Sequence, residues 1–251
     1  MVTDKIRVGD IYESNSCGLF KVVSIETLKK VTVEFLNTGY TVVVQVGQIR
    51  LGTIRDRFKK DAKTSAFLGE SSIVDDNGDI LREHTMWANM LSRCGNVKGN
   101  SPTYKDCGVS DNFKHFSYFK EWCNKQIGFD REDWHLDKDI LIKGNKLYSE
   151  DTCCFIPREI NNLLTMRKRF RGNDCPVGVH WSNNKNRYVA QVSVSGGKRK
   201  HLGCFTNAQE AFLVYKQAKE SYIKEVAEKW KDQIDPRVYE ALVSWNVEEG
   251  D

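Results

Sequence analysis

The chain has 251 residues, 40% of them hydrophobic, which is enough for one large domain or two to three small ones. Its net charge of +4 is too small to indicate a partner by itself. Between Met166 and His201, however, nine residues are basic and only Asp174 is acidic, and such a patch favours a polyanionic partner. No run of about 18 apolar residues occurs, so no membrane span is expected. The amino terminus also lacks the apolar core of a signal peptide.

The cysteines show no C-x-x-C pair and are expected to be reduced, buried thiols of a cytosolic protein. There are eight of them: Cys17, Cys94, Cys107, Cys123, Cys153, Cys154, Cys175 and Cys204. A zinc site built from Cys94, Cys107 and Cys123 is the alternative, although structural zinc sites usually show tight paired spacing.

Residues 1–58 are predicted to form a small β-domain. The segments 20–25, 31–36 and 41–46 are rich in β-branched residues, and Asn37–Gly39 is a turn. Two interpretations stay open, a structural module or an accessory nucleic-acid contact. The contact would use Arg50, Arg55, Arg57, Lys59 and Lys60. The structural module is the preferred interpretation. The string FLNTGYTVVVQVGQIRLGTIRD resembles N-terminal modules that accompany phage-encoded HNH-type proteins, which adds a little weight to the accessory contact.

Residues 59–79 are polar and are predicted to form a linker. Trp87, Met90, Leu91 and Cys94 then recur at helical spacing and predict a helix that ends in the segment Gly95–Pro102. A second helix is predicted to begin near Ser110 or Asp111, either of which can cap it. The aromatic residues of both helices are expected in the core.

The next segment, WHLDKDILIKGNKLYSEDTCCFIPREINNLL, predicts strand, turn, strand and helix. The expected elements are a strand over Trp134–Leu141, a turn at Lys143–Lys146, a return strand from Leu147–Tyr148, and a helix with Pro157 in its first turn. In this arrangement Asp137 and Asn161 converge.

This segment resembles the HNH (ββα-metal) motif of phage and intron-encoded homing endonucleases. The resemblance implies that Asp137 binds a magnesium-class cation, that Asn145 holds the hairpin together, and that Asn161 completes the metal site from the helix. The family usually has a general-base histidine after the aspartate, and here Lys138 stands in its place.

The replacement of that histidine leaves the catalytic base open. A lysine with a pKa near ~10.4 is charged at neutral pH and cannot accept a proton unless its surroundings lower the pKa. His135 and Asp139 alternate with Lys138 and share the strand face of Asp137. His135 is therefore the other candidate base, and Asp139 is a candidate metal ligand or proton acceptor. The predicted reaction is hydrolysis of a phosphodiester assisted by Mg2+ or Mn2+. The alternative is a degenerate motif retained only as a fold.

Residues 174–251 predict a third domain. Strands are expected over Gly178–Trp181, Tyr188–Val194 and Lys200–Phe205, and Thr206 and Gln209 match a capping box before a long helix. One face of the sheet would carry the helix, and the other would present polar side chains that can enter a major groove. A last helix is predicted from Pro236, and the acidic end at 248–251 is expected to fray.

Residues 177–225 closely resemble the ethylene-response-factor type of DNA-binding domain, the AP-two domain. The matching strings are GVHW, RYVAQV, KRKHLGCF and TNAQEAFLVYKQA. The resemblance implies DNA contacts from Trp181, Lys185, Arg187, Gln191, Ser193, Lys198, Arg199, Lys200 and His201. The basic string adds Arg167, Arg169 and Arg171, which would bridge the motif and the sheet along the phosphate backbone.

The expected architecture is α+β, with domains at 1–58, 80–166 and 174–251. The predicted function is a sequence-directed, metal-dependent DNA endonuclease that acts on double-stranded DNA in the cytoplasm of an infected bacterial host. The sequence leaves open two alternatives, a non-catalytic phage DNA-binding or regulatory protein and a module that engages a host protein. It therefore does not decide whether the chain is an enzyme.

Overall fold

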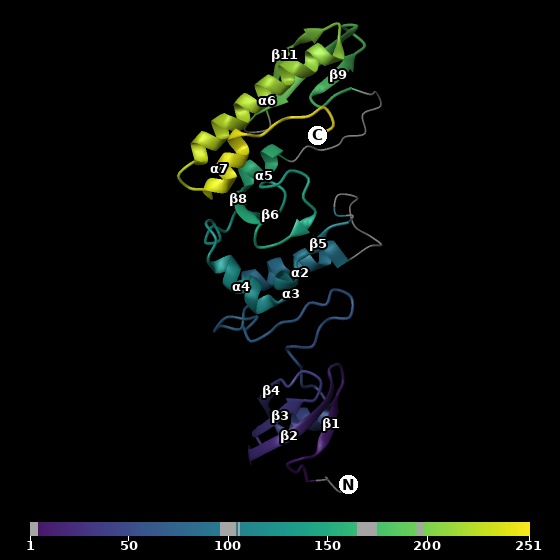
Figure 1. Cartoon of the computed structure of the whole chain (residues 1–251), viewed down its shortest axis with the longest axis vertical. Helices are drawn as coiled ribbons and strands as arrows, with labels where there is room; N and C mark the ends of the chain where they lie inside the picture. The colour runs from purple at the N-terminus through teal and green to yellow at the C-terminus, as the bar shows by residue number, and fades with distance from the viewer. Residues whose placement is uncertain (1–4, 96–103, 105, 165–174, 195–197) are drawn as a thin grey trace. The chain divides into compact units, whose positions relative to one another are not determined.

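The structure, a computed structural model, describes residues 5–95, 104, 106–164, 175–194 and 198–251 (Figure 1). The chain divides into two compact units. The first comprises Met1–Lys105 and Val109–Glu121, and the second comprises Asp106–Gly108 and Trp122–Asp251. Both contain helices and antiparallel strands, so the predicted α+β class is confirmed. Within the described ranges no helix is long and apolar enough to cross a membrane.

The border between the two units falls inside the predicted central domain 80–166. The helical segment that follows the linker therefore belongs with the N-terminal sheet, while the segment that resembles an HNH motif belongs with the C-terminal sheet.

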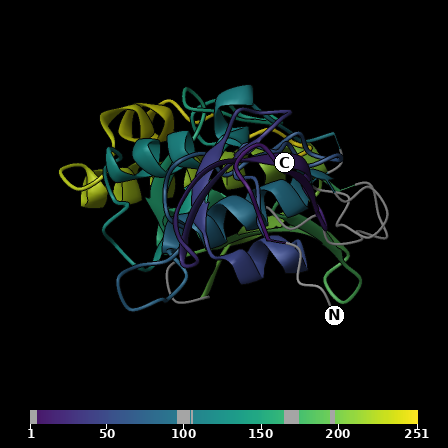
Figure 2. The ribbon, with the colours of Figure 1, turned by 90° about the horizontal axis from the view of Figure 1, so that it is seen from below.

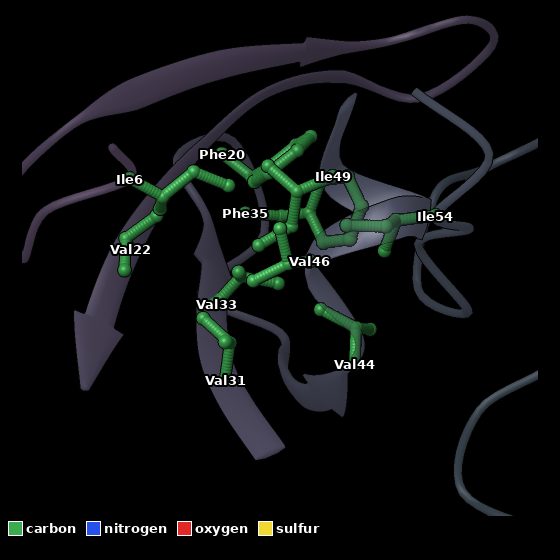
Figure 3. Close-up of a cluster of buried hydrophobic side chains, with 10 residues drawn as sticks. All are labelled: Ile6, Phe20, Val22, Val31, Val33, Phe35, Val44, Val46, Ile49 and Ile54. Carbon is green, nitrogen blue, oxygen red and sulfur yellow. The ribbon is translucent and has the colours of Figure 1, made fainter. Parts of the chain in front are cut away.

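The first unit begins with an antiparallel four-stranded sheet in the order β1-β2-β3-β4. The predicted strands are present, and they are followed by a short helix. These elements are β1 (Ile11–Ser14), β2 (Gly18–Thr27), β3 (Lys30–Phe35), β4 (Thr41–Val44) and α1 (Val46–Leu51). Alternate side chains of β2 and β3 point inward, and Phe20, Val22, Val33 and Phe35 are 0% exposed. Figure 3 shows how Val46 and Ile49 of α1 close this core.

A row of aromatic contacts continues from this sheet into the helical segment of the same unit. The ring centroids of Tyr40 and Phe58 lie 5.4 Å apart, those of Phe58 and Phe67 lie 6.1 Å apart, and those of Phe67 and His115 lie 4.5 Å apart. The segment 59–79, predicted as a linker, is therefore held by packed rings. This packing explains why the sheet and the helices form one unit.

The helices of this segment are α2 (Arg82–Gly95), α3 (Asp111–Lys114) and α4 (Phe116–Asn124), the last of which continues into the second unit. Ser110 caps α3 by accepting a hydrogen bond from the amide of Phe113, as predicted. The predicted single helix is divided at His115, the extended C-cap residue of α3. The predicted break after Gly95 lies mostly outside the described residues.

In the second unit, β6 (Trp134–Asp137) pairs antiparallel with β8 (Cys154–Pro157), and α5 (Arg158–Leu164) follows directly. The prediction of a return strand at Leu147–Tyr148 is wrong. That segment is β7, which pairs with β5 (Gly108–Val109). The apolar run of β8 buries all four of its residues, whereas Leu147 of β7 is exposed. The strand that pairs with β6 is therefore the one whose side chains are buried on both of its faces, which is β8.

The predicted strand Trp134–Leu141 is also too long. It ends at Asp137, because one carboxylate oxygen of Asp137 accepts hydrogen bonds from the backbone amides of Asp139 (2.9 Å) and Ile140 (2.8 Å). This local side-chain bond bends the backbone away from the strand.

The C-terminal part has the predicted three strands and long helix. The elements are β9 (Val179–Ser182), β10 (Arg187–Ser193), β11 (Arg199–Phe205), α6 (Ala208–Trp230) and α7 (Pro236–Val243). The sheet order is β11-β10-β9, and α6 packs along it, with α7 following in yellow (Figure 1, Figure 2). The cap of α6 is Asn207, whose side chain accepts from the amide of Gln209, rather than Thr206 as predicted.

The acidic end does not fray as predicted. The backbone amide of Val177 donates to the carbonyl of Glu249 (3.0 Å), and the Lys143 ammonium lies 2.8 Å from a carboxylate oxygen of Asp251. These contacts join the end of the chain to the start of β9 and to the loop after β6.

Candidate nucleic-acid interface and metal centre

One face of the β9–β10–β11 sheet is open, and cross-strand pairing decides which side chains share it. Arg187, Gln191 and Ser193 alternate along β10 with Ala190 and Val192, which are 0% and 2% exposed on the face that α6 covers. Gln191 pairs with His201, and Ser193 pairs with Arg199. Directly paired residues lie on the same face. The open face therefore carries the Arg187, Gln191, Ser193, Arg199 and His201 side chains.

His180 also lies on this open face, and sequence reasoning missed it. It is exposed and pairs with Val189, two residues from both Arg187 and Gln191. The GVHW string contains both His180 and Trp181, and the sequence alone does not decide which of the two faces outward. Val179 is buried, so its neighbour must point to the opposite side of the strand.

Lys185 reaches the open face from the turn between β9 and β10. Its ammonium lies 3.6 Å from the sulfur of Cys204, and a ring nitrogen of His201 lies 3.7 Å from the same sulfur. No residue of the three strands is acidic. The open face thus gathers cationic and neutral donors without a competing carboxylate.

The structure does not bring every predicted contact to this face. Trp181 pairs with Tyr188, its ring centroid 4.8 Å away, and Lys200 pairs with Val192. Both pairs belong to the helix-covered face. Their β10 members, Tyr188 and Val192, lie an odd number of residues from Gln191, so their side chains point to the opposite side of the sheet. Lys198 is exposed just before β11. Arg167, Arg169 and Arg171 lie outside the described residues.

The loop after β6 contains two neighbouring carboxyl groups. Asp137, at the end of β6, is half-buried, and Asp139 follows two residues later. Burial, and after it the negative charge of Asp139, raises the pKa of Asp137 to about 6. Like charges held together in a partly dry site favour either a proton or a bound cation.

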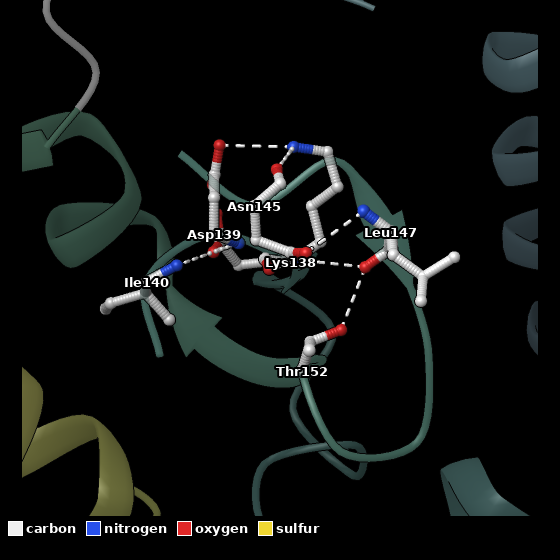
Figure 4. A network of polar contacts seen from close by, with 7 residues as sticks. Lys138, Asp139, Ile140, Asn145, Leu147 and Thr152 are labelled. Carbon is white, nitrogen blue, oxygen red and sulfur yellow. Dashed lines mark hydrogen bonds and ion pairs between the residues drawn. The ribbon is translucent and has the colours of Figure 1, made fainter. Parts of the chain in front are cut away.

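Lys138 lies between these two acids in sequence but points into the loop. It is 7% exposed. Its ammonium donates to the Asp139 carboxylate (3.2 Å) and to the backbone carbonyl of Asn145 (2.9 Å), as Figure 4 shows. It also lies 5.8 Å from the centre of the Tyr148 ring. With these contacts, Lys138 stabilises the conformation of the loop.

Asn145 closes the same loop from the other end. Its side-chain amide donates to the carbonyls of Lys138 and Leu147, both at 2.6 Å, and its side-chain oxygen accepts from the amide of Leu147 at 3.1 Å. Figure 4 shows these bonds and the Thr152 hydroxyl, which donates to the same Leu147 carbonyl. The role predicted for Asn145, holding the motif together, agrees with this geometry.

The remaining predicted residues surround this loop. His135 is exposed on β6, two residues before Asp137 and so on the same face. Asn161 is half-buried on α5. Within the described ranges, no three His, Cys, Asp or Glu side chains form a metal-binding group. Asp137 and Asp139 are the two neighbouring acids of this loop, and magnesium is commonly held by one or two carboxylates together with substrate phosphates.

No disulfide joins any of the eight cysteines, all of which the structure describes. Among the described residues, Cys94, Cys107 and Cys123 belong to no group of three possible metal ligands. Cys107, Cys123, Cys153 and Cys154 are buried as expected, whereas Cys204 is exposed. Burial raises the pKa of Cys153 to about 12, which keeps that thiol protonated and unreactive.

The basic residues proposed for an accessory contact in the first unit are largely engaged within it. The Arg57 guanidinium donates to the carbonyl of Ser71, the Lys59 ammonium donates to the carbonyl of Ser16, and the Lys60 ammonium lies 5.9 Å from the centre of the Phe67 ring. Arg50 and Arg55 are exposed. This arrangement favours the structural interpretation of the β-domain.

Comparison with family models, with curated proteins and with solved structures found no significant match.

Proposed function

We propose that this chain is a sequence-directed DNA endonuclease that binds duplex DNA through the open sheet face and hydrolyses a phosphodiester at the loop after β6. The observation that carries the proposal is that one compact unit contains both an acid-free cationic sheet face and a carboxyl pair at the end of a strand of a ββα arrangement. The resemblance to AP-two and HNH segments agrees with this assignment.

In the binding step, the cationic residues Lys185, Arg187 and Arg199 meet phosphates or guanine edges. Gln191 and His201 offer side chains that can donate and accept hydrogen bonds at base edges, with His180 beside them. Glutamine pairs well with adenine, and arginine pairs well with guanine. A sheet that presents such side chains without acidic neighbours suits the major groove of a duplex.

In the hydrolytic step, Asp137 and Asp139 would hold a magnesium-class cation, with Asn161 as the further ligand that the HNH resemblance implies. The oxygen donors and the raised pKa of Asp137 fit such a cation. The cation, when bound, offsets charge on the scissile phosphate and acidifies its water. Asn145 and Lys138 hold the loop in shape. His135, which is exposed on the same face as Asp137, would accept the proton.

A second candidate function is DNA binding without cleavage. The Lys138 ammonium supports it, because it stands where the HNH family has its base and already neutralises Asp139 at 3.2 Å. In that case the DNA-binding face is retained, and the loop serves only as part of the fold.

Nicking of supercoiled plasmid with Mg2+ or Mn2+ distinguishes the two functions. The endonuclease predicts nicking that a chelator and Asp137→Ala abolish, while the matched control Glu132→Ala, at an exposed acid outside the loop, retains it. Because the cut could require a specific site, the plasmid carries sequences selected by the protein from a random duplex pool. Binding without nicking on those plasmids would favour the second candidate, and failure to select any duplex would reject both.

A further inference from the structure

A buried lysine joins the long helix α6 to the ββα arrangement. Lys219 is 6% exposed, and its ammonium donates to the backbone carbonyl of Leu163 in the last turn of α5 at 2.9 Å. Burial lowers the pKa of Lys219 to about 8. A carbonyl at the end of a helix is an acceptor that the helix itself leaves unsatisfied, so this contact serves both elements.

The carboxyl end of α6 makes a second set of contacts with the same arrangement. Glu159 of α5 accepts hydrogen bonds from the Lys229 ammonium (2.5 Å) and from the indole nitrogen of Trp230 (2.8 Å). The Trp230 ring meets Trp134 of β6 edge to face, with centroids 6.0 Å apart. Both α5 and β6 are therefore held from the same helix.

The C-terminal segment adds a third connection. Lys143, in the loop after β6, donates to the carbonyl of Asn246 (3.0 Å) and pairs with Asp251 (2.8 Å). The amide of Val247 in turn donates to Glu220 of α6 at 2.9 Å. The segment therefore binds both the loop that carries Asp139 and the helix that covers the sheet.

We infer that α6 is a rigid bridge that fixes the spacing between the carboxyl pair and the open sheet face, with Lys219 and Glu159 as positioning residues. The rigid bridge follows from the contacts above, whereas its effect on where DNA is cut rests on the proposed function. A duplex held by the sheet meets the Asp137 loop at one set distance along its axis, so the strand break falls at a fixed offset from the recognised bases. A motif attached through the chain alone would reach a range of positions.

Mapping the position of the loop on bound DNA tests this consequence without requiring nuclease activity. An iron chelate that generates hydroxyl radicals is attached to Ile142→Cys, which is exposed in the loop. The exposed and half-buried cysteines Cys17, Cys94, Cys175 and Cys204 are first replaced by serine. We expect breaks within about one helical turn (~10 base pairs) at a constant distance from the footprint. Breaks spread over several turns from an unchanged footprint would overturn the inference.

Positioning is separated from general stability by the double variant Lys219→Met with Glu159→Gln. We expect it to broaden the window of breaks at least twofold while the footprint stays in place. The matched control Glu225→Gln, at an exposed acid on the same helix, should leave the window unchanged. An equally narrow window in the double variant would remove both residues from the positioning role.

Hydrogen exchange tests the bridge even if the protein binds no DNA. We expect backbone amides of β6 and β8 to exchange through the same opening as those of β10 and β11, and Glu159→Gln to raise both sets of rates by the same factor. Separate openings, with only the β6 and β8 amides responding to Glu159→Gln, would overturn the rigid bridge. Failure to bind DNA together with a shared opening would instead reject the proposed function alone.

Discussion

The N-terminal and C-terminal sheets have the same construction and different outward faces. Both are antiparallel, with consecutive strands adjacent and one face buried. On the N-terminal strands, Ile11, Val23 and Val43 are exposed. On the C-terminal sheet the open face carries Arg187 and Arg199 among amide and imidazole groups. Sheet architecture thus fixes where side chains point, and the residues at alternate positions decide what the surface can bind.

The two sheets also differ in what covers them. The short helix α1 closes the N-terminal core with Val46 and Ile49. The long helix α6 covers the C-terminal sheet with apolar residues and also buries the charge of Lys219. The first cover stabilises only its own unit, whereas the second joins the sheet to the ββα arrangement.

The largest expected effect is on stability: a core substitution in the N-terminal sheet should destabilise the first unit and leave DNA binding by the second unit unchanged. Phe20→Ala empties a site that is 0% exposed, and we expect a loss of about 3–5 kcal/mol in the unfolding free energy of the first unit. DNA affinity of the second unit should not change. Denaturant titration followed by a binding assay below the midpoint measures both, with the exposed Val23→Ala as control. Loss of DNA affinity while the first unit is still folded would assign the β-domain a role in binding.

The buried charge under α6 predicts a pH dependence. The pKa of Lys219 falls from 10.5 to about 8 on folding, so the unfolded chain binds more protons between these pH values. The unfolding free energy should therefore rise with pH across that interval, by about 3 kcal/mol at most at ~1.4 kcal/mol per pKa unit. Lys219→Met removes a titrating group from both states and should flatten this rise. A native and a variant curve that run parallel from pH 8 to pH 10 would contradict the burial of a charged ammonium.

A smaller effect is expected on DNA affinity, when one exposed arginine from each sheet region is replaced by alanine. Arg187→Ala should weaken duplex binding by about 1–3 kcal/mol if Arg187 contacts a base, whereas Arg55→Ala, exposed in the first unit, should leave affinity unchanged. Fluorescence anisotropy on one selected duplex at fixed salt gives both affinities. Equal losses of duplex affinity in the two variants would mean that the open face of the C-terminal sheet is not the specific DNA-binding surface.

The sequence predicted what depends on local pattern and missed what depends on pairing. Alternation along 188–194 and the helical spacing after 208 were sufficient for the C-terminal strands and helix. The partner of β6 was misassigned, because Leu147–Tyr148 and Cys154–Pro157 are both short and apolar, and only their long-range burial separates them.

The candidate site shows the same division. The likeness to known motifs singled out Asp137 as a metal ligand and Asn145 as the residue that holds the hairpin together, and in the structure both form hydrogen bonds within the loop that are local in sequence. It could not reveal that Lys138 turns inward, or that His180 rather than Trp181 shares the open face. A shift of one residue in the pairing of β9 would exchange the faces of His180 and Trp181, and a strand of only four residues does not determine its own register.

The smallest expected effect distinguishes phosphate contacts from base contacts on the open sheet. Lys198 is exposed at the start of β11, beside Arg199 but outside the paired register. If it serves phosphate, Lys198→Ala should weaken binding to all duplexes alike and reduce the slope of log affinity against log salt by about one. Arg187→Ala should instead change the ranking of duplex sequences. Salt titrations on a selected and a scrambled duplex measure both quantities. A sequence-dependent loss from Lys198→Ala would show that base recognition extends past the paired strands, and the open face would then be larger than cross-strand pairing defines it.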